Sequence, residues 1–148
     1  MRRWIILSEL GLLVLVVAIQ FIPVGTANPP VERGIPTSPA LKAVLRRVCY
    51  DCHSHETVWP WYSHIAPVSW LLAYDVQEGR AELNFSTWNQ YSTQQHVKKL
   101  QESWKEVSEG EMPPWYYLPA HRNARLSADD RTLLEQWART PPEGTQNP

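Results

Sequence analysis

The hydrophobic positions of the chain begin with one long apolar run near the amino terminus. This run covers residues 4–22, and two basic residues, Arg2 and Arg3, precede it. About 20 helical residues rise about 30 Å, which is the thickness of the hydrocarbon core of a bilayer. Basic residues before such a run favour a cytoplasmic amino end, so the rest of the chain is expected to be exported. We therefore predict one N-terminal transmembrane helix within residues 1–23.

Cleavage of this segment is an alternative, because the small residues 25–27 resemble a signal peptidase site. The apolar run is longer than the core of about 7–15 residues that is typical of a signal peptide, which favours an uncleaved anchor. Glu9 and Gln20 lie inside the run and weaken the pattern of a single span. Residues 1–23 are thus predicted to be a membrane anchor or a signal segment.

Beyond the run, apolar residues recur at helical spacing. The prolines and glycines of residues 24–37 predict an extended, Pro-rich tether. Ser38 before Pro39 is typical of a helix start, and apolar residues spaced by three and four lead from there to Cys49. Further helical patterns cover residues 67–78, 93–108 and 128–140, with Gly79 and Gly110 after the first two and Ser127 before the third. Residues 38–140 are therefore predicted to form one all-α domain, and residues 141–148 a disordered tail.

The two cysteines of the chain lie in the stretch Cys49-Tyr50-Asp51-Cys52-His53. Two thiols separated by two residues and followed by an imidazole are what covalent attachment of a c-type haem requires. The thiols add to the two vinyl groups of the porphyrin, and the histidine is placed to ligate the iron. We predict one covalent haem c attached through Cys49 and Cys52, with His53 as an axial ligand.

Three other interpretations of the motif are weaker. A structural zinc site needs four ligands, and no second cysteine pair exists, although His55 and His64 could complete a set with His53. A thioredoxin-like dithiol belongs near a β-α-β pattern, which the surrounding sequence lacks. A disulfide across two residues would be strained and would leave the histidine without a role. These arguments favour haem attachment.

The stretch Met112-Pro113-Pro114 supplies the preferred second axial ligand. Met112 is the only methionine besides the initiator, and a thioether is a common sixth ligand in electron carriers. The two prolines prevent helical continuation and are expected to hold Met112 in a stiff loop. Although a lone methionine is more often a core residue, its position after the haem motif favours ligation.

The remaining histidines compete for the same position. His55 is too close to His53 in sequence to cross easily to the opposite face of a haem. His64, His96 and His121 have the reach, but each is more typical of a solvated or hydrogen-bonded surface histidine. His64 lies within an aromatic, proline-containing loop and is the second candidate after Met112.

Composition and charge refine this picture. The chain contains 8 Trp and 13 Pro residues, and large flat side chains suit a fold that covers a planar cofactor, although they also fill ordinary cores. We predict that Trp59, Trp61 and Trp115 pack against the haem and limit solvent access. With 14 Lys and Arg residues against 15 Asp and Glu residues, the net charge is −1, which provides no basic field for nucleic acid.

Several motifs together resemble the bacterial haem-binding domain family of small membrane-anchored c-type proteins. They are the stretches 49–54, 59–63, 65–70, 79–80, 83–86 and 112–114, and the resemblance covers about residues 20–140. The order of the parts is also similar to the carboxy-terminal half of class I cytochrome c. The resemblance implies a cytochrome c-like helical fold, one covalent haem, His53 and Met112 as axial ligands, and a periplasmic location.

These features predict an electron carrier rather than an enzyme. The haem domain is expected on the periplasmic side of a bacterial cytoplasmic membrane, held by the single N-terminal helix and meeting a redox protein transiently. One alternative is a peroxidase-like haem enzyme, in which Met112 dissociates and His55 or His64 assists O–O cleavage. Another is a haem-based sensor of redox state or small gases.

Overall fold

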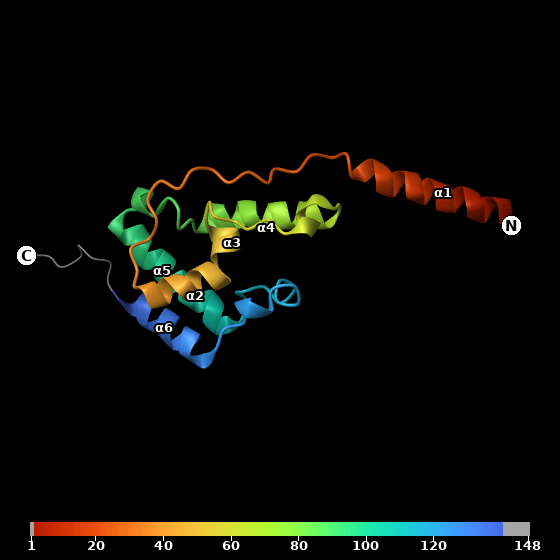
Figure 1. Cartoon of the computed structure of the whole chain (residues 1–148). Helices are drawn as coiled ribbons and strands as arrows, with labels where there is room; N and C mark the ends of the chain where they lie inside the picture. Colours follow the sequence, from red (N-terminus) through yellow and green to blue (C-terminus); the bar gives the residue numbers. More distant parts are fainter. Residues whose placement is uncertain (1, 141–148) are drawn as a thin grey trace, which may run out of the picture.

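The computed structural model describes residues 2–140, and all regular elements within that range are helices (Figure 1). The α-helices are α1 (Arg2–Ile19), α2 (Pro39–Val48), α3 (Tyr50–His53), α4 (Val68–Glu82), α5 (Thr93–Glu109) and α6 (Ala128–Arg139). Three short 3-10 helices are η1 (Trp61–His64), η2 (Trp88–Gln90) and η3 (Arg122–Ala124). The all-α fold class predicted from the sequence is confirmed. The predicted disordered tail, residues 141–148, lies outside the described residues.

α1 contains most of the amino-terminal apolar run and projects away from the other helices (Figure 1). None of its residues is buried. Across residues 2–140, no helix combines the length and the apolar character that crossing a membrane requires. The predicted transmembrane helix is therefore corrected to an 18-residue helix that ends at Ile19 and includes Arg2, Arg3 and Glu9.

The segment predicted to be a tether is extended, but it is bound to the helical domain along its length. We call residues 20–37 the strap; it runs beside α4 before it turns toward α2 (Figure 1). At its start, the Gln20 side chain donates to the Ala66 carbonyl (3.2 Å) and accepts from the Ala66 N–H (2.9 Å). Near its end, Ile35 is buried in the core. The strap is therefore held to the domain at both of its ends.

Arg80 of α4 makes the central contacts of the strap. Its guanidinium donates to the Ala27 carbonyl (3.0 Å) and to Oδ1 of Asn28 (2.7 Å). The same group donates to the Ser54 carbonyl (2.8 Å) and to Oγ1 of Thr57 (2.9 Å). Because guanidinium offers five donors in a fixed plane, one side chain can join the strap to the segment that follows the cysteine motif.

Three helix ends follow from local side-chain chemistry. The Ser38 hydroxyl caps α2 by accepting from the Leu41 N–H, and Ser127 caps α6 through a reciprocal pair of bonds with Asp130. α5 ends at Gly110, whose φ of 84° is a left-handed conformation that glycine adopts without steric cost. These boundaries confirm the helix ends predicted from Ser38, Ser127 and Gly110.

The helices pack around one hydrophobic core. α5 packs against α6, α2 packs against α3 and α6, and α3 packs against α4. The core residues are Ile35, Leu41, Val44, Leu45, Tyr50, Phe85, Trp88, Leu100, Val107 and Leu134. Burial of these side chains is the main favourable contribution to folding. Because α3 follows α2 directly, burial of the apolar face of α2 also fixes the position of the cysteine motif.

One predicted helix end is wrong. The sequence predicts that a helix stops at Gly79, but α4 continues through this residue to Glu82. A Cβ at Gly79 would lie 2.8 Å from the Cys52 carbonyl oxygen, which is closer than two such atoms can approach. Gly79 is therefore explained by the close packing of α3 on α4, where no side chain fits.

Candidate haem-binding cavity

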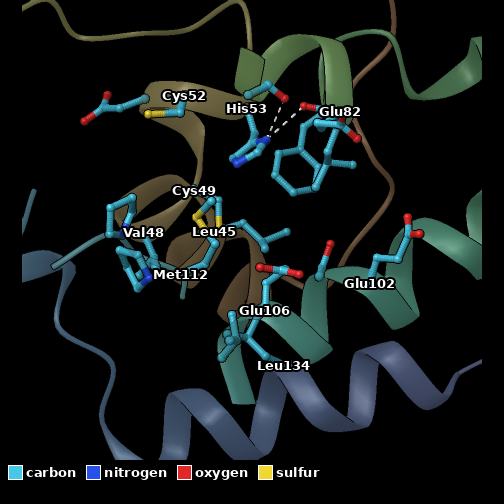
Figure 2. Close-up of a pocket in the computed structure, with 18 of the residues that line it drawn as sticks. Leu45, Val48, Cys49, Cys52, His53, Glu82, Glu102, Glu106, Met112 and Leu134 are labelled. Carbon is cyan, nitrogen blue, oxygen red and sulfur yellow. Dashed lines mark hydrogen bonds between the residues drawn. The ribbon is translucent and has the colours of Figure 1, made fainter. Parts of the chain in front are cut away.

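A cavity of about 570 Å³ lies between the α2–α3 junction, α4, α5, α6 and the loop after α5. This volume falls in the range of about 300–1,000 Å³ that is typical of small-molecule sites. Its apolar wall is formed by Leu45, Val48, Phe85, Trp104, Val107, Leu134 and Trp137. Figure 2 shows Cys49, Cys52, His53 and Met112 around this cavity. The structure thus brings together the two predicted attachment residues and the two predicted axial ligands.

The helical turn of α3 presents both thiols to the cavity. The Cys49 N–H donates to the Leu45 carbonyl at the end of α2 (2.8 Å), and the His53 N–H donates back to the Cys49 carbonyl (2.9 Å). Both cysteines are free. Burial raises the pKa of each thiol to about 12, so neither is a thiolate near neutral pH. Low thiolate content does not match the activated cysteine of a dithiol oxidoreductase.

The His53 ring is oriented by two carbonyl groups. Its Nδ1 donates to the Gly79 carbonyl (2.7 Å) and lies 3.1 Å from the Leu83 carbonyl, both of which are drawn with dashed lines in Figure 2. Since a carbonyl can only accept, Nδ1 carries the proton and Nε2 keeps its lone pair. Burial lowers the pKa of His53, which also favours the neutral ring. A neutral imidazole with a hydrogen-bonded Nδ1–H is the form that ligates a metal through Nε2.

Met112 approaches the cavity from the loop that follows α5. The left-handed turn at Gly110 reverses the chain, and the Met112 N–H donates to the Glu106 carbonyl (3.1 Å). Met112, Pro113 and Pro114 all line the cavity, and Met112 is 37 % exposed. Met112 is therefore a partly exposed residue of the cavity lining and does not belong to the core.

The three tryptophans predicted to cover the haem do not line this cavity. Trp61 and Trp115 are 76 % and 80 % exposed, and Trp59 lies in the segment that leads into η1. The tryptophans that do line the cavity are Trp104 of α5 and Trp137 of α6, which were not predicted from the sequence. Both belong to apolar helix faces, and only the packing of α5 on α6 directs them to the site.

The histidines other than His53 have different roles. Both ring nitrogens of His55 are engaged, one within 2.7 Å of the Pro30 carbonyl and the other 2.8 Å from the Asn84 amide. His64 is exposed, and none of His64, His96 and His121 lines the cavity. Among residues 2–140, no cluster of three or more His, Cys, Asp or Glu side chains could hold a metal ion, so the zinc interpretation gains no support.

Two tyrosines at the cavity were not identified from the sequence. The Tyr117 hydroxyl donates to Oδ2 of Asp51 inside the cysteine motif (2.7 Å), and the Tyr116 hydroxyl donates to Oδ2 of Asp75 on α4 (3.3 Å). Burial and the neighbouring Asp51 carboxylate raise the pKa of Tyr117, so this hydroxyl stays protonated. The partners are 66 and 41 residues apart. No local sequence pattern could have indicated these contacts.

Acidic groups outnumber basic groups around the cavity. The carboxylates are Asp51, Asp75, Glu78, Glu82, Glu102 and Glu106, and the amines are Lys99 and Lys105. Burial raises the pKa of Asp75, which reflects a carboxylate partly removed from water. The lining of the cavity therefore carries an excess of negatively charged side chains.

Two free thiols, an imidazole with an available Nε2, a thioether and an apolar wall form a donor set that fits a haem. An all-α fold with this cavity defines a haem-binding protein. The chain belongs to the haem-binding domain family, whose family model matches residues 14–140. Comparisons with curated proteins and with solved structures gave no significant match. The family resemblance inferred from the sequence motifs is thus confirmed.

Proposed function

We propose that the protein is a mono-haem c-type cytochrome that carries single electrons. The observation that carries this proposal is the arrangement of His53, with its Nδ1 held by two carbonyls, in the same cavity as two free thiols and Met112. Cys49 and Cys52 would hold the haem through thioether bonds, and His53 and Met112 would be its axial ligands. When bound, the haem supplies an iron that cycles between the ferric and ferrous states.

The chain's own residues tune this site in three ways. The Gly79 and Leu83 carbonyls fix the ring of His53 and make it a stronger donor. The apolar wall excludes water, which favours the less charged ferrous state and raises the reduction potential. The methionine thioether acts in the same direction, since His/Met ligation gives high potentials.

The residues at the cavity favour a carrier over a peroxidase. Cleavage of an O–O bond uses a distal histidine or arginine, and the residues described around this cavity include no histidine besides His53 and no arginine. The two histidines considered for this role do not line it, since His55 is held by Pro30 and Asn84 and His64 is exposed. A haem-based sensor would need a labile sixth position on the iron, and the carbon monoxide test described below would detect such a position.

Location and partners form part of the proposal. Covalent haem attachment in bacteria takes place outside the cytoplasmic membrane, so we propose an exported domain that stays associated with the membrane through the exposed apolar side chains of α1. The partner would be a redox protein with a basic docking surface, because carboxylates outnumber amines among the residues that line the cavity. Such encounters are brief and bury little area. Detection of haem in membrane and soluble fractions tests the association.

Two measurements test the proposed function. The mass of the denatured chain should increase by one haem, and replacement of both Cys49 and Cys52 by Ala should remove that increase. The second measurement is the ferrous spectrum of the wild-type protein, which carbon monoxide should leave unchanged, as expected of an iron with two protein ligands. Haem lost on denaturation would contradict covalent attachment, and ready binding of carbon monoxide or turnover of peroxide would contradict the carrier.

A further inference from the structure

Backbone hydrogen bonds to α5 hold the loop that carries Met112 at its start. The Glu111 and Met112 N–H groups both donate to the Glu106 carbonyl at the end of α5 (2.9 and 3.1 Å). From Met112 to His121 the chain forms turns without an α-helix, and its backbone bonds are local, such as Tyr117 N–H to the Pro114 carbonyl (3.0 Å). The position of the second half of this loop therefore depends on side-chain contacts with other elements.

One of these contacts reaches the cysteine motif itself. The Tyr117 hydroxyl donates to Oδ2 of Asp51 at 2.7 Å, a distance typical of a strong bond to a carboxylate. The other oxygen of Asp51 accepts from the Val58 N–H (3.1 Å), so the carboxylate is held on both sides. Asp51 lies between Cys49 and Cys52 in α3. The bond therefore joins the element that carries the attachment residues and His53 to the loop that carries Met112.

The surroundings of Tyr117 also hold it in place. Its ring stacks on His121, with centroids 3.8 Å apart and an angle of 5° between the planes. The His121 ring also lies near the Tyr62 hydroxyl, at 3.4 Å from Nε2. Tyr117 is half-buried and lines the cavity. Its hydroxyl is thus pre-oriented toward Asp51, so little side-chain entropy is lost when the bond forms.

We propose that Tyr117 is a positioning residue whose hydrogen bond to Asp51 holds the Met112 loop closed over the cavity and keeps the thioether at the sixth position of the iron. This inference rests on the axial ligation by Met112 proposed above. In this role Tyr117 acts through the loop and not as a ligand. Without the bond, the loop opens more often, and a small external ligand competes with Met112 more effectively.

Tyr116 provides a matched control. It precedes Tyr117 in the same loop, and its hydroxyl also donates to a carboxylate, that of Asp75. That bond is longer, at 3.3 Å, and exposed to solvent. Tyr116→Phe therefore removes the same atom as Tyr117→Phe from the same loop, but it breaks a contact that water readily replaces.

The experiment titrates the ferric, haem-loaded full chain with imidazole and follows the Soret and far-red absorption. A hydrogen bond to a charged group contributes about tenfold to a hundredfold in an equilibrium, so the apparent affinity for imidazole should rise at least about tenfold in Tyr117→Phe. In Tyr116→Phe it should change less than about threefold. The Asp51→Asn variant, which keeps an acceptor oxygen, should lie between wild type and Tyr117→Phe.

The outcomes separate this inference from the proposed function. Absence of the weak far-red methionine–iron band in the wild type would overturn Met112 ligation and, with it, the inference. A wild-type band together with equal imidazole affinities for Tyr117→Phe and Tyr116→Phe would overturn the inference alone. If Tyr117→Phe fails to incorporate haem, the decision falls to Asp51→Asn, whose affinity must rise for the inference to stand.

Discussion

The contact between Gly79 and Cys52 decides whether replacement of Gly79 by Ala stabilises or destabilises the protein. Within a helix, replacement of Gly by Ala normally stabilises by about 1 kcal/mol, because the backbone loses less conformational freedom on folding. At Gly79 the added methyl group would lie 2.8 Å from the Cys52 carbonyl oxygen and 3.1 Å from its carbonyl carbon. These are backbone atoms of α3, so the methyl group can be accommodated only if α3 moves away from α4.

Overpacking of this kind costs about 1–3 kcal/mol. After the gain in helix propensity is subtracted, Gly79→Ala should lower the free energy of unfolding by about 1 kcal/mol. The displacement also affects the site, because the Gly79 carbonyl accepts from Nδ1 of His53 at 2.7 Å. We therefore expect a shift in the Soret band along with the loss of stability.

Urea unfolding of the haem-loaded protein, followed by far-UV circular dichroism and by haem absorbance, measures both effects. Ala81→Gly is the matched control, since Ala81 is an exposed position two residues further along α4 and should lose about 1 kcal/mol through propensity alone. A Gly79→Ala protein that is about 1 kcal/mol more stable than wild type, with an unchanged spectrum, would refute the close packing of α3 on α4.

Two further predictions concern α6 and the strap. Burial alone would raise the pKa of Asp130, but hydrogen bonds from Ser127 and the guanidinium of Arg47 lower it below its usual value. The ionised Asp130 therefore stabilises the folded protein above the unfolded pKa of about 3.9, and this stabilisation is lost as the pH falls through the lower folded pKa. Asp130→Asn should therefore lower the free energy of unfolding by about 1 kcal/mol at neutral pH. Urea titrations should show that this difference from the wild type shrinks below about pH 4. A difference that does not change with pH would contradict the role given to the ionised Asp130. Arg80→Ala should release the strap and increase the rate of tryptic cleavage after Arg33 about tenfold, because each hydrogen bond of the guanidinium contributes about 1 kcal/mol or more. Lys98→Ala on α5 is the control. Equal cleavage rates in Arg80→Ala and the wild type would show that other contacts hold the strap.

Local chemistry made much of the helical fold predictable. Ser38, Ser127 and Gly110 act through their own backbone neighbours, so the helix ends they cause can be read without knowledge of the fold. Gly79 was misinterpreted because the glycine satisfies a packing contact with Cys52, which is distant in sequence. The apolar run at the amino terminus forms a helix, but no helix within residues 2–140 has the length and apolar character of a membrane span.

Some features of the site are likewise determined by neighbouring residues, and others by distant segments of the chain. Adjacent residues define the motif from Cys49 to His53, and Met112 is a candidate ligand from the sequence because it is the only methionine besides the initiator. The carbonyls that orient His53 and the bond from Tyr117 to Asp51 come from chain segments 26 to 66 residues away. Likewise, the exposed positions of Trp61 and Trp115 follow from loop geometry, which aromatic composition does not encode.

Axial ligation by Met112 can be tested directly by the far-red absorption of the ferric protein, recorded for the wild type and for Met112→Ala. A thioether bound to ferric iron gives a weak band in this region, so we expect the band in the wild type and its loss in Met112→Ala. The variant should also bind carbon monoxide when reduced, because its sixth position is open. A wild-type spectrum without this band, or a band that persists in Met112→Ala, would contradict axial ligation by Met112 and the electron-carrier function built on it.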